Sequence, residues 1–448
     1  MPFRRGHSEG EGAGENPGGR LGGNTGGNPG KSSDTVPGKG TLHGPARHKL
    51  TRRRFVGAAA AGAATLAAIS LVGCTDGSSA EGSEDTTEAT GEPQVITDES
   101  QVVDVTDEYE NVDTEFTATY TWTLPLGTVL FHSEGSWCAA MFAPESALYV
   151  NTLGVVSIAE GTTATLVEEP LNGSGYDFYD VRCGSGVFAW VEENFLTCDW
   201  MLIAQEYSEG ALVGDPVELD SGDEDWEPAK FATTGSSVIW LKMPLASGDA
   251  STENSHCYRW TVGSSSGKEL YESPGRFATA PRVSDGVLTI TPRVNADEGT
   301  YYGLTAMDLA DASVIERLVM PSSVKPFEAT YMNGQFAFSV EANYDSGGAL
   351  GNMGSYLGNE GGPFITLSRE PLACVVGKGT QYYIKVKSSH YVVDTDAETY
   401  AVLSAPSNTM DYGDYPASEG TTDQLVTYAT LRGDDGAPES VCMRVFDL

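Results

Sequence analysis

The sequence predicts an all-β domain, a β-propeller, from about residue 115 to residue 448. Short runs rich in Val, Ile, Tyr, Phe and Trp alternate with Gly, Asp and Ser turns, and long helical periodicity is absent. Two different landmarks recur with one shared spacing, and the chain ends partway through a repeat unit. Units of about 40–50 residues with four short strands each are typical of propeller blades.

The first landmark is a tight turn followed by a strand of aromatic and aliphatic residues. It begins at Ser146, Gly186, Gly235, Gly286, Gly334, Gly379 and Gly420, at intervals of 40, 49, 51, 48, 45 and 41 residues. The second landmark is a short turn between two strands, at Gly161, Gly210, Gly267, Ala312, Gly361 and Ala397. The agreement of two separate landmarks indicates a structural repeat.

The last unit is incomplete. The chain ends at Leu448, where earlier units turn into a fourth strand, while residues 117–126 read as a strand that precedes the first unit. We therefore predict seven blades, with the N-terminal strand completing the last one and removing the open sheet edges. Six blades is the alternative, because the last two units are short.

Residues 51–74 combine a basic cluster with an apolar run that ends at Cys74. Arg52, Arg53 and Phe55 stand in the order of the twin-arginine (Tat) consensus, which this segment resembles. Residues 71–74, Leu-Val-Gly-Cys, resemble the lipobox of bacterial lipoproteins. These resemblances imply export by the Tat route and a diacylglyceryl group on Cys74, which would hold the protein at the outer face of the cytoplasmic membrane or in the cell envelope.

The other segments follow from composition. Residues 1–50 are rich in Gly, Asn and Pro and are expected to be disordered. Residues 75–114 are expected to form an acidic, flexible tether, and residues 115–448 the propeller. As a whole the chain resembles bacterial β-propeller lipoproteins, loosely of the TolB type, in architecture and not through a residue motif.

Charge narrows the partners. The chain has a formal net charge of −37, and residues 75–448 hold 16 of its 26 Lys and Arg but 59 of its 63 Asp and Glu. This balance disfavours nucleic acid and adsorption to anionic lipid, so membrane attachment is expected through Cys74 alone. The six later cysteines lack metal-ligand spacing, and core thiols and disulfides stay open alternatives: Cys138, Cys183, Cys198, Cys257, Cys374 and Cys442.

Acidic and aromatic residues precede several of the repeat glycines, where the innermost strands and the loops leading into them are expected. We predict that they gather at one mouth of the central channel. Carboxylates there would suit Ca²⁺, and carboxylates with aromatic faces would suit a cationic or sugar ligand. A channel lined with solvated acids is the alternative. The candidate residues are Asp177, Asp180, Glu328, Glu370, Asp411, Asp414, Trp226 and Tyr412.

These observations favour a binding or scaffold module for a protein, a cell-envelope component or a solute. The alternative is an exported enzyme that cleaves glycans or peptides, with Asp180 and Asp414 as an acid/base pair. Free carboxyl groups are a condition of that alternative, because pairing with arginine would remove them from acid/base work. No Gly-x-Ser-x-Gly nucleophile elbow is predicted, because the Gly-Ser-Ser-Ser-Gly run at residues 263–267 falls in a predicted turn between two strands and not between a strand and a helix. His132, His256 and His390 are scattered along the repeat.

Overall fold

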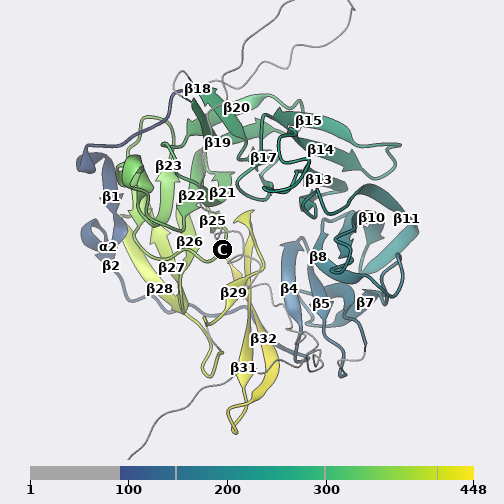
Figure 1. The fold of residues 1–448 in the computed structure, drawn as a ribbon. Coiled ribbons are helices and arrows are strands. Elements are labelled where there is room, and N and C mark those ends of the chain that lie inside the picture. Colours follow the sequence, from purple (N-terminus) through teal and green to yellow (C-terminus); the bar gives the residue numbers. More distant parts are fainter. Residues whose placement is uncertain (1–90, 147–148, 297–298, 411) are drawn as a thin grey trace, which may run out of the picture. The chain divides into compact units, whose positions relative to one another are not determined.

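The computed structural model describes residues 91–448, apart from residues 147–148, 297–298 and 411. Within this part of the chain, seven antiparallel sheets follow one another in sequence order (Figure 1). The β-propeller prediction is therefore confirmed. The predictions for residues 1–90, including those for Arg52, Arg53, Phe55 and Cys74, concern residues outside the described part of the chain.

Blades 1 to 3 each contain four strands in simple meander order. Blade 1 consists of β4 (Val129–Glu134), β5 (Trp137–Phe142), β6 (Thr152–Ser157) and β7 (Thr163–Val167). Blade 2 consists of β8 (Asp177–Cys183), β9 (Val187–Glu193), β10 (Trp200–Ser208) and β11 (Ala211–Gly222). Blade 3 consists of β12 (Lys230–Thr234), β13 (Ser237–Lys242), β14 (Ser255–Thr261) and β15 (Lys268–Ser273).

Blades 4 to 6 carry additional strands. Blade 4 consists of β16 (Arg282–Ser284), β17 (Val287–Ile290), β18 (Arg293–Ala296), β19 (Gly299–Asp308) and β20 (Val314–Val319). Blade 5 consists of β21 (Pro326–Met332), β22 (Gln335–Val340), β23 (Gly354–Gly358), β24 (Phe364–Leu367) and the added β1 (Val102–Asp104). Blade 6 consists of β25 (Val376–Lys378), β26 (Gln381–Lys385), β27 (Ser389–Asp394), β28 (Thr399–Ser404) and the added β2 (Glu110–Asn111) and β30 (Gly420–Thr421).

Blade 7 joins the two ends of the propeller. It consists of β29 (Tyr415–Pro416), β31 (Gln424–Arg432), β32 (Pro438–Asp447) and, as its outer strand, β3 (Tyr120–Leu124). The predicted closure, with three strands from the C-terminal end and one from the N-terminal end, is confirmed by the pairing of β3 with β32. The innermost strand, β29, has only two residues, which makes this blade the least regular of the seven.

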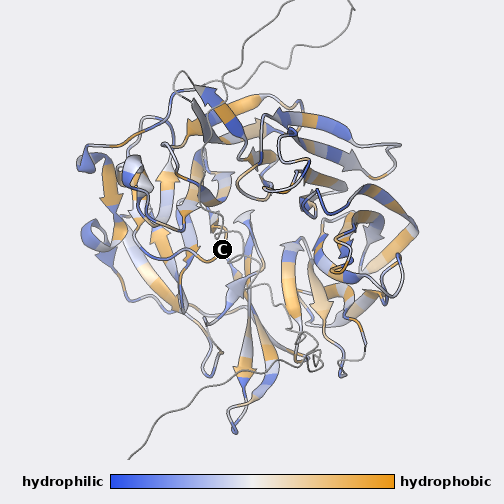
Figure 2. Ribbon diagram, in the orientation of Figure 1, coloured by the Kyte–Doolittle hydropathy of each residue, from blue (hydrophilic) through white to orange (hydrophobic). Residues whose placement is uncertain are grey.

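The core is divided among the spaces between neighbouring blades. Seven hydrophobic clusters occur in the described part of the chain, and each draws residues from two adjacent sheets. One of them joins Leu130 of blade 1 to Met443 of blade 7. Because the last sheet packs on the first, seven interfaces for seven sheets indicate a closed ring. Hydrophobic residues gather on the strands, and many turns are hydrophilic (Figure 2).

The repeat was read correctly except in its first unit. The glycines from Gly186 to Gly379 precede the second strands of blades 2 to 6, and the second landmark marks the turns from the third to the fourth strands of blades 1 to 6. In blade 1, however, the second strand is β5, which follows Gly135, and the predicted strand after Ser146 is wrong. The turn at Gly135 lies 51 residues before Gly186, so the correction makes the period more regular.

The predicted tether ends too late. Residues 91–114 include a 3-10 helix, η1 (Glu99–Gln101), and a short helix, α2 (Val105–Glu108), and both β1 and β2 pair in parallel with outer strands of the ring. Ile96 and Val105 are buried, 5% and 1% exposed, against blades 5 and 6. Their apolar side chains attach this acidic segment to the propeller.

Two further 3-10 helices, η2 (Asp345–Gly347) and η3 (Ala349–Gly351), lie between β22 and β23. Among the described residues, no helix has the length and apolar character needed to cross a membrane. All six cysteines of the propeller are unpaired, and five of them are buried. The core-thiol alternative therefore holds for the five buried cysteines, whereas Cys198 is exposed.

Candidate functional site

The N-terminal ends of the innermost strands define one face of the ring, which we call the N-face. In an antiparallel meander, the connections between second and third strands lie on this same face. It therefore includes the start of β12 at Lys230, the end of β9 at Glu193 and the end of β13 at Lys242. From the sequence, the acidic and aromatic candidate residues are predicted to gather on this face.

A network of ion pairs links the innermost strands across the centre. Arg282 of β16 donates three hydrogen bonds to Glu328 of β21, two to Oε2 at 2.8 and 3.1 Å and one to Oε1 at 3.0 Å. The Oε2 atom of Glu419 accepts from both Arg282 and Arg182 of β8, at 3.0 Å each. Burial opposes the charge of Arg282, but Glu328 and Glu419 outweigh it and raise its pKa. Four blades thus contribute to a central network whose main charges are paired.

A second group of charges lies on the N-face of blades 3 to 5. Glu227 precedes β12 and forms ion pairs with Lys230, at 3.4 Å, and with Arg276. Desolvation, followed by the positive charges of Lys230 and Arg276, lowers the pKa of Lys325 just before β21, although Lys325 as a whole residue is exposed. Arg293, at the start of β18, also acts on Lys325 and stacks on Tyr302 at 3.7 Å. We call Lys230, Arg276, Arg293 and Lys325 the basic cluster.

Glu193, at the N-face end of β9, adds a titratable group to this face. It is 8% exposed, its Oε2 atom has no hydrogen-bond partner, and burial raises its pKa to about 7. Burial and then the charges of Glu193, Asp180 and Glu227 raise the pKa of Tyr179. The charges of Glu193 and Glu227 thus both act on Tyr179. A carboxyl group that titrates near neutral pH is suited to transferring protons.

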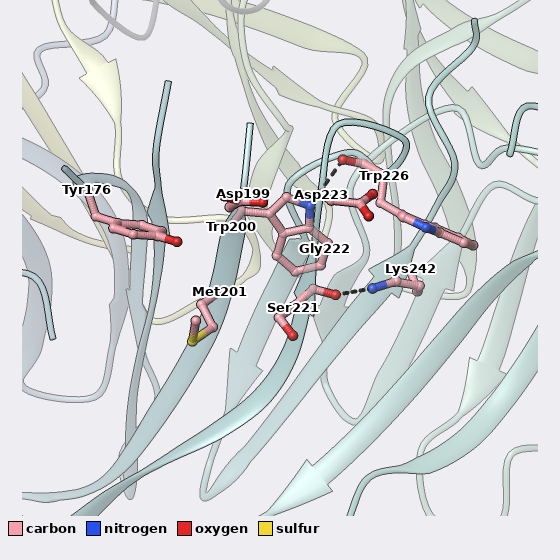
Figure 3. A pocket seen from close by; sticks show the side chains of 9 residues that line it. All are labelled: Tyr176, Asp199, Trp200, Met201, Ser221, Gly222, Asp223, Trp226 and Lys242. Atoms are coloured by element: carbon pink, nitrogen blue, oxygen red, sulfur yellow. Dashed lines mark hydrogen bonds between the residues drawn. The ribbon is translucent and has the colours of Figure 1, made fainter. Parts of the chain in front are cut away.

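A hollow of about 450 Å³ opens next to the basic cluster, between blades 2 and 3 (Figure 3). Trp226 lies in an extended segment, where it forms a β-bridge with Pro244. Successive side chains of an extended segment project in opposite directions. The Trp226 side chain therefore lines the hollow, while that of Glu227 contacts the basic cluster. The hollow is lined by Tyr176, Asp199, Trp200, Met201, Ser221, Gly222, Asp223, Trp226 and Lys242.

Lys242 is held firmly at the floor of this hollow. Its Nζ lies 4.7 Å from the ring centre of Trp200 and 5.0 Å from that of Trp226, and it donates to Asp220 at 3.0 Å. Trp200 in turn donates to the backbone oxygen of Trp226 at 3.1 Å. A Cβ atom at Gly222 would lie 2.6 Å from the Trp200 ring, so a larger residue would displace the indole.

The predicted acids do not form one cluster. Asp180 lies 3.8 Å from Arg182 and Glu328 pairs with Arg282, so both belong to the central network. Asp177 and Glu370 are exposed, at the start of β8 and after β24. In the described part of the chain, no three of the predicted acids bring their oxygens together as ligands for one ion. Of the two predicted aromatic residues, Trp226 lines the hollow, whereas Tyr412 is 37% exposed and accepts a hydrogen bond from Lys385 through its backbone oxygen. Asp411 lies outside the described residues.

Asp414 is buried between blades 6 and 7, at 1% exposure. It pairs with Arg444 of β32, and its Oδ1 lies 3.7 Å from Nδ1 of His390 in β27. Burial would raise the pKa of Asp414, but His390 and Arg444 outweigh it and lower the value. Burial lowers the pKa of His390 to about 4. Since both Asp180 and Asp414 are paired with arginine, the condition set for them as an acid/base pair is not met.

Sequence reasoning missed Glu193, Glu227 and the basic cluster. Glu193 ends a strand that reads as ordinary core, and its unusual state comes from burial, which no local pattern reveals. The four basic residues belong to separate blades or loops and meet only in the folded ring. One signal was present: basic residues are so scarce in residues 75–448 that each was a candidate for a specific role.

Comparisons with known proteins add little beyond this fold. No family model matches the chain. It is 29% identical over 216 residues to pectin lyase D and probable pectin lyase D of Aspergillus niger, over 42% of this chain and 55% of theirs. The chain thus spans about half the length of the curated relatives it matches.

Solved structures that resemble the chain include propeller-containing proteins. A structure from a study of two prolyl endopeptidases has a TM-score of 0.46 and 12% identity, over 70% of this chain and 46% of that one. The propeller domain of the Trilobed protease from Pyrococcus furiosus has a TM-score of 0.40 and 12% identity, over 58% and 79%. An oligogalacturonate lyase in complex with manganese has a TM-score of 0.43 and 8% identity, over 76% and 96%. Likeness at this level carries no argument about activity, and the propeller assignment rests on the seven sheets themselves.

Proposed function

We propose that this protein is a lipid-anchored propeller outside the cytoplasmic membrane, and that it is a binding module for an anionic ligand at its N-face. The basic cluster is the observation that carries the proposal. In a chain with a net charge of −37, four cations gather on three neighbouring blades, and Glu227 forms ion pairs with two of them, Lys230 and Arg276. The surrounding negative charge would repel most anions, so a local excess of cations suits one specific anionic partner.

The neighbouring hollow supports a ligand longer than a single ion. Tyr176 and Trp226 line this hollow, and Trp226 immediately precedes Glu227, the residue that pairs with the basic cluster. Aromatic side chains supply contact area and the basic cluster supplies charge, a combination suited to an acidic glycan or a phosphate-bearing polymer. Both share repeated negative charge, and a binding experiment separates them.

The test measures binding of the full chain to polygalacturonate, to polyphosphate and to neutral dextran by isothermal titration calorimetry. The pectin lyase match makes a uronate polymer the natural first probe. We expect one of the two anionic polymers to bind and dextran to fail. Lys325→Glu should weaken binding at least about tenfold, because it reverses one charge in the cluster. Lys268→Glu is the matched control, since Lys268 is exposed at the opposite end of β15 from the N-face.

Equal binding by Lys325→Glu and Lys268→Glu would place the ligand elsewhere, and lack of binding by both anionic polymers would contradict the anionic class. The anchor is tested separately. The protein as made in cells should partition into detergent, and Cys74→Ala should move to the aqueous phase, because the thiol that carries the lipid is gone. Unchanged partitioning of Cys74→Ala would contradict the anchor.

One observation favours an enzyme as the second candidate. Glu193, with its pKa raised to about 7 by burial, lies on the same N-face as the basic cluster, and a carboxyl group of this kind is suited to acid/base cleavage of an acidic glycan. If this candidate holds, polygalacturonate or a related polymer is cleaved, and Glu193→Gln abolishes cleavage while binding persists. Binding without cleavage by the unaltered chain would favour the binding module.

A further inference from the structure

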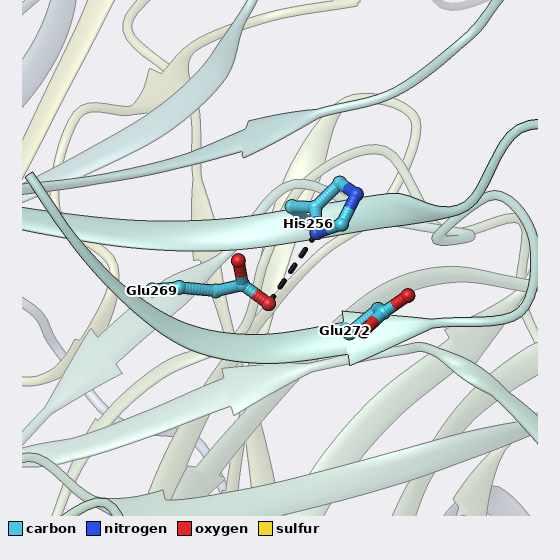
Figure 4. A group of neighbouring side chains, drawn as sticks. All are labelled: His256, Glu269 and Glu272. Atoms are coloured by element: carbon cyan, nitrogen blue, oxygen red, sulfur yellow. Dashed lines mark ion pairs between the residues drawn. The ribbon is translucent and has the colours of Figure 1, made fainter. Parts of the chain in front are cut away.

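Three side chains with metal-ligand atoms meet on the outer half of blade 3. They are His256 of β14 and Glu269 and Glu272 of β15 (Figure 4). One possible ligand atom from each residue lies within 4.8 Å of the others. Among the described residues, this is the one set of three or more His, Cys, Asp or Glu side chains whose ligand atoms lie this close together. Neither glutamate belongs to the candidate residues of the N-face.

The meeting of the two glutamates depends on a β-bulge. In a regular strand, residues three positions apart project to opposite sides of the sheet. Here His256 pairs with Glu272 and Tyr258 pairs with Glu269, because the register shifts between Cys257 and Tyr258. The extra residue, Leu270, packs with the core between blades 3 and 4. The bulge thus places both carboxylates on the side of the sheet that carries His256.

The imidazole has an unmet polar atom that faces these carboxylates. Nδ1 of His256 is inaccessible to solvent and has no hydrogen-bond partner, although Oε1 of Glu269 lies 3.4 Å away. The ring is held by stacking on Tyr258, with ring centres 5.9 Å apart. Asn254 donates a hydrogen bond to Glu272 and orients that carboxylate. A polar atom that is buried without a partner destabilises the fold unless a ligand satisfies it.

We propose that His256, Glu269 and Glu272 bind a divalent transition-metal ion of the Zn²⁺ class. One imidazole nitrogen and two carboxylate oxygens form a three-ligand set that leaves a position for water or another molecule. Ca²⁺ and Mg²⁺ prefer oxygen-only sites, so the histidine selects against them. The ion satisfies Nδ1 of His256 and joins β14 to β15, the outer strand of the blade. It is independent of the ligand proposed for the N-face.

The site is also close to the hollow between blades 2 and 3. His256 is the direct cross-strand partner of Lys242, which forms the floor of that hollow. Opposed residues in an antiparallel pair have Cβ atoms about 4.5–5.5 Å apart. The ion therefore stabilises the strand next to the one that positions Lys242.

The experiment uses the full chain after removal of metal with a chelator. Zn²⁺ is titrated by calorimetry, and Co²⁺ is added in parallel because its visible absorption reports the ligands around the ion. Glu269→Gln and Glu272→Gln each remove one ligand with little change in size. We expect each to weaken Zn²⁺ binding at least about tenfold and to change the Co²⁺ spectrum. His256→Ala should do the same.

Glu206→Gln is the matched control, because Glu206 is an exposed glutamate on β10, the third strand of the neighbouring blade. It should bind Zn²⁺ like the unaltered chain. His7, His43 and His48 are present in every variant, so any metal that they hold appears equally in all titrations. If His256→Ala fails to fold, as judged by circular dichroism, the two glutamine variants decide the outcome. The proposal is overturned if both keep the Zn²⁺ affinity of the unaltered chain, or if that chain prefers Ca²⁺.

Discussion

Leu124 in β3, the outer strand of blade 7, is paired with Val441 in the neighbouring strand β32. Residues 317 positions apart in the sequence thus close the ring. Both side chains are buried in the cluster that joins blade 7 to blade 1. Closure therefore rests on one antiparallel pair, β3 with β32, and on the core behind it. Four outcomes test this closure and the buried charges of the ring.

Thr123→Cys should form a disulfide with Cys442, because these two residues face each other across the closing pair. Paired Cα atoms in antiparallel strands lie about 4.5–5.5 Å apart, within the range that a disulfide spans. Since the bond closes a very long loop, we expect about 2–5 kcal/mol of added stability under oxidising conditions. Thermal melting with and without reductant measures this gain.

Thr121→Cys is the control for the disulfide, since its partner is Arg444 and not a cysteine. It should gain nothing on oxidation. If Thr123→Cys stays unbridged by mass spectrometry, or bridges without any change in melting temperature, β3 is not the closing strand in solution.

Arg282→Met should destabilise the ring by about 3–5 kcal/mol, because Glu328 loses the arginine that neutralises it in a largely desolvated site. Urea unfolding measures the loss. Adding Glu328→Gln should restore part of it, since the unpaired charge is then removed. Arg369→Met serves as the control, because Arg369 is exposed and donates only to a neighbouring backbone oxygen. A similar small loss in both arginine variants would contradict a stabilising central network.

Glu193→Gln should alter the pH dependence of stability. Because the pKa of Glu193 is raised to about 7 in the fold, the folded chain holds an extra proton between about pH 4.5 and 7. Folding is then favoured at low pH and loses this advantage as pH rises through 7. Glu193→Gln cannot ionise at this position and lacks this loss. The free energy of unfolding of the variant minus that of the unaltered chain should therefore be about 1–3 kcal/mol larger at pH 8 than at pH 4. Glu206→Gln should leave the profile unchanged, and an unchanged profile in Glu193→Gln would refute the raised pKa.

His390 should have the opposite effect on stability. Burial lowers its pKa to about 4, so the unfolded chain takes up a proton on this residue between about pH 6.5 and 4 while the folded chain does not. This contribution is complete above pH 6.5 and is lost as pH falls, by up to about 3 kcal/mol. His390→Gln removes the titrating group and should flatten this part of the curve, as measured by urea unfolding at a series of pH values. A slope that survives in the variant would assign the acid sensitivity to other groups.

The repeat could be read from the sequence because each blade is built locally. Gly235, Gly286, Gly334 and Gly379 all have positive φ angles at hairpin turns, a backbone conformation that favours glycine, so the turns left a visible mark. In blade 1 the same role belongs to Gly135, whereas the sequence prediction had placed this turn at Ser146. The attachment of Ile96 and Val105 was missed because two apolar residues in an acidic segment show no periodicity.

The candidate site was predicted less well, and for a physical reason. Trp226 was placed correctly beside a hollow, but Asp180, Glu328 and Asp414 meet arginines from other strands or blades, and no sequence interval encodes those distances. The location of a carboxylate can follow from a local register, whereas its charge state depends on what surrounds it.

By itself, the sequence determined the all-β repeat, its period, the strand that closes the ring and the overall negative charge, since these depend on local patterns and on counting. Only the tertiary structure decided which charges are paired, that the four scarce cations of the basic cluster meet on the N-face, and that a bulge turns Glu269 toward His256. Such contacts join residues that are distant in the chain or shift by one position in register, and a one-residue shift reverses the side of the sheet on which a side chain lies.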